Sequence, residues 1–143
     1  MTDLIAKARS ACKLPIGYQL GHGGYHPNDA TPSRDGLCDC SGFIAFLVGR
    51  SRKPDDKFRW WLSTDSIHDD AIGAQVLFSR IPLPVPGCIA VYPDHDGKQG
   101  HTALIVDPKT WTIIDCSRSQ NGVTEHIGKY WSTTPNVVFC VPV

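Results

Sequence analysis

The sequence lacks the features that define several protein classes. No apolar run among its 143 residues approaches the ~20 residues that cross a membrane, so we expect no membrane-spanning segment. Neither sign of charge is in excess, because 14 basic residues balance 14 acidic ones, and this argues against nucleic acid or an anionic membrane as a partner. Internal repeats and low-complexity segments are also missing. We expect one domain, residues 1–143, that acts as a monomer.

The six cysteines do not form a pattern that indicates disulfides or zinc. Their spacings are scattered, and the charged first residues do not read as a secretion signal. Cys38 and Cys40 flank a single residue, a spacing that rarely suits a disulfide or a zinc knuckle, although a metal site with His22 or His26 is a minor alternative. We therefore expect a reduced protein without metal or cofactor. Four cysteines are expected as small core residues: Cys12, Cys88, Cys116 and Cys140.

Residues 38–48, with the sequence CDCSGFIAFLV, carry the most informative pattern in the chain. Small residues follow Cys40, and Phe43, Phe46 and Leu47 then recur at helical spacing. Cys40 is thus expected in the first turn of a buried helix, where free N–H groups and the helix dipole favour the nucleophilic thiolate. The alternative is a small buried cysteine that only begins a core helix. This segment alone does not decide between the two.

A histidine and an aspartate in compatible positions favour catalysis. His101 stands at the start of the apolar run 102–106, which reads as a strand, and residues 111–116 read as a second strand after a turn at 107–110. In an antiparallel hairpin Asp115 returns close to His101, where its carboxylate can orient the imidazole. Singly, His101 reads as a surface histidine and Asp115 as an exposed charge. With Cys40, they form a nucleophile, a base and an orienting group.

These landmarks resemble a known family, the NlpC-type cell-wall peptidases, which are papain-like cysteine enzymes acting on bacterial peptidoglycan. The residues that carry the resemblance are residues 18–24, Asp39-Cys40-Ser41-Gly42-Phe43, Pro86-Gly87 before the strand 89–92, and Gly100-His101. The resemblance extends from about Tyr18 to Cys116. Two positions depart from it. Cys88 follows Pro86-Gly87 where many members have Asp, and the third catalytic position is more often His, Asn or Gln than Asp.

The resemblance implies roles for six residues. Cys40 would be the nucleophile, His101 the base and then the acid, and Asp115 the orienting group. Three more would bind the free amino terminus of a short stem peptide, with the tyrosine hydroxyl near the oxyanion: Tyr18, Asp39 and Ser41. Tyr25 is the alternative to Tyr18, because it lies in the same glycine-rich loop.

The resemblance also implies the reaction, which is hydrolysis of an amide bond in a peptidoglycan stem peptide or muropeptide, usually between D-glutamate and a diamino acid. Within the enzyme class the same triad could serve an N-acetylmuramoyl-L-alanine amidase or an acyl transferase. From other classes, the alternatives are a thiol redox sensor in which Cys38 resolves an oxidised Cys40, and a catalytically silent phage or secretion assembly module. Delivery by phage lysis or a secretion machine, or action on recycled wall fragments, would reconcile a wall substrate with the expected lack of an export signal.

The expected architecture is α+β and papain-like, with N-terminal helices, including the nucleophile helix, packed on a small antiparallel sheet or half-barrel. A first helix capped by Thr2 and a helix at residues 63–71 are predicted, with strands near 88–92, 102–107, 111–116 and 137–141. Trp60 and Trp61 are expected in core and rim packing rather than in a substrate groove. Four histidines are expected in loops or near turns without a chemical role: His22, His26, His95 and His126. A basic cluster is expected to solvate a loop, with pairing to the carboxylates of an acidic peptide substrate as the alternative: Arg50, Arg52, Lys53, Lys57 and Arg59.

Overall fold

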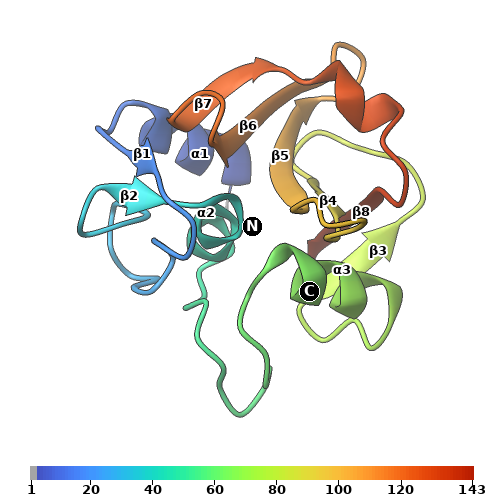
Figure 1. The fold of residues 1–143 in the computed structure, drawn as a ribbon, viewed down its shortest axis with the longest axis horizontal. Coiled ribbons are helices and arrows are strands. Elements are labelled where there is room, and N and C mark those ends of the chain that lie inside the picture. The colour runs from blue at the N-terminus through green and yellow to red at the C-terminus, as the bar shows by residue number, and fades with distance from the viewer. Residues whose placement is uncertain (1–2) are drawn as a thin grey trace.

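The computed structural model describes residues 3–143, and the α+β class predicted from the sequence is confirmed (Figure 1). The helices are α1 (Leu4–Cys12), α2 (Cys40–Leu47), α3 (Thr64–Ile72) and the 3-10 helix η1 (Lys129–Ser132). The strands are β1 (Gly17–Tyr18), β2 (Leu37–Cys38), β3 (Phe78–Ile81), β4 (Ile89–Tyr92), β5 (His101–Asp107), β6 (Thr112–Ser117), β7 (Gly122–Ile127) and β8 (Val138–Pro142). None of the helices in this part of the chain has the length and apolar character needed to cross a bilayer.

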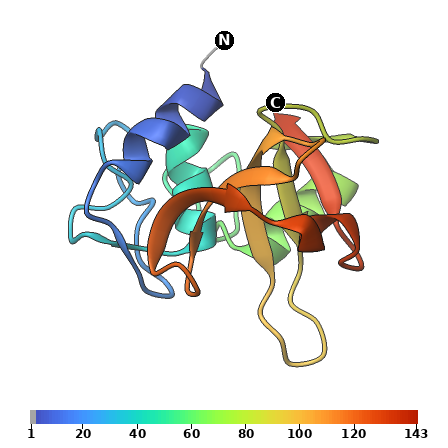
Figure 2. The ribbon, with the colours of Figure 1, turned by 90° about the horizontal axis from the view of Figure 1, so that it is seen from above.

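Six strands form one curved antiparallel sheet in the order β3-β8-β4-β5-β6-β7, while β1 and β2 form a separate parallel pair. Helices α1 and α2 pack on the end of the sheet that holds β5, β6 and β7, and α3 packs on the other end against β3, β4 and β8 (Figures 1 and 2). Helix α2 therefore packs on β5, the strand that begins at His101, as the sequence predicts.

The two faces of the sheet bury different clusters. Alternate residues such as Leu104, Ile114 and Cys116 join the large core beneath the three helices. Ala103, Ile105 and Ile113, which point the other way, form a smaller core that Trp131 of η1 covers. This alternation follows from the two-residue period of a strand. His101 and Asp115 have the parity of the second set, so they belong to the face that carries Trp131.

The helix starts have clear local causes. Asp39 caps α2 by accepting a hydrogen bond from the Gly42 N–H at 2.8 Å, and every residue of α2 is buried. Ser63 and Ser66 form a reciprocal capping box at α3. The prediction for the first helix is corrected in one respect. Thr2 lies outside the described residues, and the side chain that caps α1 is that of Asp3.

Two strands of the six-stranded sheet, β3 and β7, were not predicted, and neither was the short pair β1 and β2. The four predicted strands are confirmed as β4, β5, β6 and β8. β3 and β7 are the edge strands of the sheet, so each pairs on one side only. β7 reads Gly-Val-Thr-Glu-His-Ile and exposes part of its side chains, which leaves little apolar signal in the sequence. The prediction that His126 lies in a loop is therefore wrong, because it lies in β7.

Candidate active site

Cys40 is the first residue of α2, and close backbone packing fixes its position. The loop that precedes it lies directly on the first turn of the helix: a Cβ placed on Gly24, which has φ of +79°, would stand 2.6 Å from the carbonyl oxygen of Gly42. Only glycine allows this contact at that backbone angle. The Cys40 thiol thus lies at a rigid helix N-terminus, and it lines a cleft of about 340 Å³.

His101 and Asp115 meet in this cleft. The Nε2 atom of His101 lies 2.7 Å from Oδ2 of Asp115, whose side chain is fully buried. The imidazole stacks on the Trp131 indole, with ring centroids 5.9 Å apart, and Tyr92 of the neighbouring strand stands directly opposite His101 in the sheet. Ring packing on one side and a carboxylate on Nε2 fix the orientation of the imidazole and leave Nδ1 free of this carboxylate.

The charge of His101 depends on its two neighbours. Burial on its own would lower the pKa of the imidazole, but the interactions with Asp115 and with Cys40 outweigh burial and raise the pKa of His101 to about 10. These interactions favour the positively charged form of the imidazole. A positively charged imidazole beside a cysteine sulfur is the arrangement that an activated thiol requires.

A β-bulge places Asp115 on the same face as His101. Leu104 pairs with Ile114 and Ile105 with Ile113, but Asp107 pairs with Thr112, so Val106 is one extra residue in β5. A regular hairpin continued from the Asp107 pair would place Asp115 opposite Leu104, on the other face of the sheet. A shift of one residue reverses every side chain, so the bulge is what brings the carboxylate to the imidazole.

His126 is a site residue that the sequence did not reveal. Its Nε2 atom lies 2.8 Å from Oδ1 of Asp115, so each carboxylate oxygen contacts one histidine. Asp115 pairs with Thr124 across β6 and β7, and His126, two residues further on, is therefore a diagonal neighbour on the same face. Recognising residues 122–127 as a strand would have revealed this contact.

The structure also distinguishes between the two candidate tyrosines. Tyr18 lines the cleft together with Cys40 and His101. Tyr25 is directed elsewhere, because its hydroxyl donates to the Gly21 carbonyl oxygen at 2.7 Å and its ring lies 5.6 Å from that of Trp61. The structure thus brings Tyr18, Cys40, His101 and Asp115 together around one cleft.

Comparisons with known proteins show a likeness to solved structures. Neither a protein-family model nor a curated protein matches this chain. Among solved structures, NlpC1 from Trichomonas vaginalis is similar, with a TM-score of 0.54 at 19% sequence identity. The match covers 92% of this chain and 41% of NlpC1, so the chain spans less than half the length of that protein. The likeness is one of fold.

Asp39 and Ser41 are placed differently from Tyr18, since neither lines the cleft. The Asp39 carboxylate contacts the Arg52 guanidinium at 2.8 and 3.2 Å and accepts the Gly21 N–H at 2.8 Å. The Ser41 hydroxyl accepts from the same guanidinium at 2.9 Å. Arg52 is only 2% exposed, which corrects the prediction that this arginine solvates a loop. Its guanidinium holds the start of α2 and the loop together.

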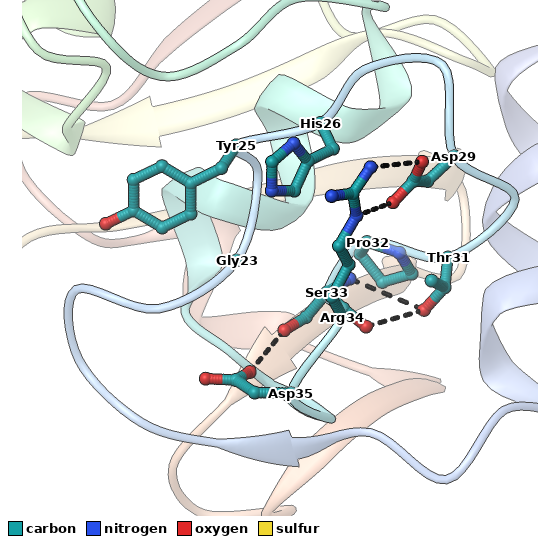
Figure 3. A pocket seen from close by; sticks show the side chains of 9 residues that line it. All are labelled: Gly23, Tyr25, His26, Asp29, Thr31, Pro32, Ser33, Arg34 and Asp35. Atoms are coloured by element: carbon teal, nitrogen blue, oxygen red, sulfur yellow. Dashed lines mark hydrogen bonds and ion pairs between the residues drawn. The ribbon is translucent and has the colours of Figure 1, made fainter.

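Two further cavities lie outside the cleft. One, of about 170 Å³, lies within the loop between β1 and β2, and polar side chains around it pair with one another: Arg34 donates to Asp29, and the Ser33 hydroxyl donates to Asp35 (Figure 3). The other, of about 450 Å³, is lined by Trp60 and Trp61 among others. These indoles are 65% and 40% exposed. Of the predicted core and rim packing, only the core part is corrected, because both side chains lie at the surface.

Of the remaining cysteines, four are buried and one, Cys12, is partly buried and packs against the core. Cys38 is buried, and its thiol donates to the backbone oxygen of Asp39 at 3.3 Å. Cys116 donates in turn to the Cys38 oxygen at 3.2 Å. Burial raises the pKa of the Cys88 and Cys140 thiols to about 11 and about 12. Within residues 3–143 no group of three or more His, Cys, Asp or Glu side chains is arranged to hold a metal ion.

Proposed function

We propose that this protein is a papain-like cysteine peptidase of the NlpC type that hydrolyses an amide bond in peptidoglycan stem peptides. The observation that carries the proposal is the 2.7 Å contact between His101 and the buried Asp115, beside a cysteine at a helix N-terminus. A fold similar to that of NlpC1 supports the same conclusion. The scissile bond that the sequence resemblance implies is the one between D-glutamate and a diamino acid.

In the proposed reaction, His101 donates its Nε2 proton to the bond with Asp115, and its Nδ1 faces the Cys40 sulfur. The Cys40 thiolate attacks the amide carbon, and the imidazolium then gives a proton to the leaving amine, so that a thioester and a neutral imidazole remain. The imidazole next takes a proton from water, whose oxygen attacks the thioester. Release of the carboxylic acid restores the thiolate and the imidazolium.

The tetrahedral intermediates carry a negative oxygen that needs donors. The first turn of α2 presents backbone N–H groups and the positive end of the helix dipole beside Cys40. The Tyr18 hydroxyl lines the same cleft. Fixed donors of this kind, aimed at the developing charge, commonly account for a large share of acyl-transfer catalysis.

The test is digestion of purified muropeptides and free tripeptides and tetrapeptides, followed by liquid chromatography–mass spectrometry. We expect new fragments with the wild-type protein and none with Cys40→Ala. Cys12→Ala is the matched control, because Cys12 ends α1 outside the cleft and its loss should leave turnover unchanged. Full turnover by a folded Cys40→Ala protein would disprove the nucleophile assignment. Fragment masses distinguish cleavage within the stem peptide from cleavage of the sugar–peptide amide.

A further inference from the structure

The cleft contains one charged side chain that the proposed mechanism does not use. Arg118 directly follows β6, is exposed and lines the cleft with Cys40 and His101. Its guanidinium lies 5.6 Å from the centre of the Tyr18 ring, a cation–π distance that holds it toward the reacting groups. No carboxylate within residues 3–143 lies within salt-bridge distance of it. Arg118 is therefore a cation available to a ligand.

Among the described residues, the same cleft offers no free carboxylate to pair with a cationic group. Asp115 is the one carboxylate among the described residues that line it, and both of its oxygens contact histidines. Asp39 lies outside the cleft and is paired with the buried Arg52. A substrate ammonium brought into this cleft would lose water without gaining a carboxylate partner, which is unfavourable. A substrate carboxylate would instead gain a partner of opposite charge, the Arg118 guanidinium.

We propose that Arg118 binds a carboxylate of the substrate close to the scissile bond, and that the enzyme does not require a free amino terminus. This inference rests on the proposed function and specifies its substrate: an acidic stem peptide, with the amino end blocked or free. The planar guanidinium suits bidentate binding of a carboxylate, and the ring of Tyr18 limits its motion. The Ser117 and Ser119 hydroxyls line the same part of the cleft and can donate to the same group.

The test uses two matched N-acetylated stem tripeptides that differ only at D-glutamate, which carries either its free carboxylate or a carboxamide. A charge-assisted hydrogen bond of ordinary strength corresponds to a preference for the carboxylate of about 10- to 100-fold in kcat/KM. We expect Arg118→Gln to abolish this preference, mainly by raising KM for the acid, and Arg118→Lys to retain part of it. Arg80→Gln is the control, since it makes the same charge change on β3, at the edge of the sheet opposite β7.

The possible results distinguish failure of the Arg118 inference from failure of the proposed function. A Cys40-dependent activity whose acid-to-amide ratio is the same in wild type and in Arg118→Gln overturns the role of Arg118. The acid peptide is also assayed with a free amino terminus. If this form is cleaved and its N-acetylated form is not, the statement on the amino terminus is overturned. Absence of Cys40-dependent hydrolysis on every peptide contradicts the proposed function itself, and the inference is then rejected with it.

Discussion

At the scale of single residues, Asp115 is the centre of the site. Its side chain is fully buried, and its two oxygens lie 2.7 Å from His101 and 2.8 Å from His126. A buried carboxylate is expensive to desolvate unless its oxygens are hydrogen-bonded. His126 therefore fixes the orientation of the Asp115 carboxylate, as Asp115 fixes that of the His101 imidazole. It is a positioning residue rather than a catalytic one.

His126→Leu should reveal this role. Because the substitution leaves Oδ1 of Asp115 without a partner, we expect a loss of about 1–3 kcal/mol in the free energy of unfolding, together with a lower kcat. His126→Gln retains an N–H donor and should recover part of both. Urea denaturation and steady-state kinetics measure the two effects. A leucine variant as stable and as active as wild type would show that Asp115 needs one histidine only.

At the scale of elements, the site depends on how α2 is anchored. Arg52 reaches Asp39 and Ser41 at the helix start, and it also donates to the backbone oxygens of His22 and Gly23 at 3.2 Å. This single side chain joins the N-cap of the nucleophile helix to the loop that packs on it. The aspartate that resembles a substrate-binding residue in the sequence is thus part of the scaffold in the fold.

Arg52→Met should be strongly destabilising, since it leaves the Asp39 charge buried without its partner. Removing one member of a buried ion pair costs about 3–5 kcal/mol, whereas an exposed substitution changes stability by about 0.5 kcal/mol or less. Arg59→Met is the matched control, because Arg59 is exposed and belongs to the same basic segment. Chemical denaturation of both variants tests this. Equal stabilities would mean that the pair contributes nothing to the anchoring of α2.

Sequence patterns predict some helices and strands better than others. The apolar spacing after Cys40 predicts α2, and the β-branched runs predict β5 and β6, because those segments are buried along their length. β7 is an edge strand with polar positions, so its sequence gives little indication of a strand. The bulge at Val106 and the pairing of Asp39 with Arg52 are set by tertiary packing, and no local pattern specifies either.

At the scale of the whole molecule, the site exists only in the folded chain, since Cys40 and His101 come from the helical part and from the sheet. The free energy of unfolding therefore depends on whether His101 is protonated. The folded-state pKa of about 10 lies above the usual value of 6.5, so the folded protein holds this proton more tightly than the unfolded chain. Stability from this group is fully present below about pH 6.5 and is lost as the pH rises toward about 10.

The corresponding prediction compares wild type with His101→Gln across this window. Because only wild type gains from the bound proton, we expect the difference in unfolding free energy between them to shrink between pH 6.5 and pH 10. Denaturant titrations with a reductant present, at pH 6, 8 and 10, provide the measurement. A difference that stays constant, or grows with pH, would show that His101 does not hold an extra proton in the folded state.

The central claim is that His101 and Asp115 activate Cys40, and alkylation kinetics test it without knowledge of the substrate. Peptide-level mass spectrometry would follow the reaction of iodoacetamide with Cys40 at pH 6, in wild type and in His101→Gln. The account predicts that Cys40 reacts many-fold faster in wild type, and that buried thiols such as Cys88 and Cys140 stay unmodified in both. Equal rates at Cys40 in the two proteins would contradict the account.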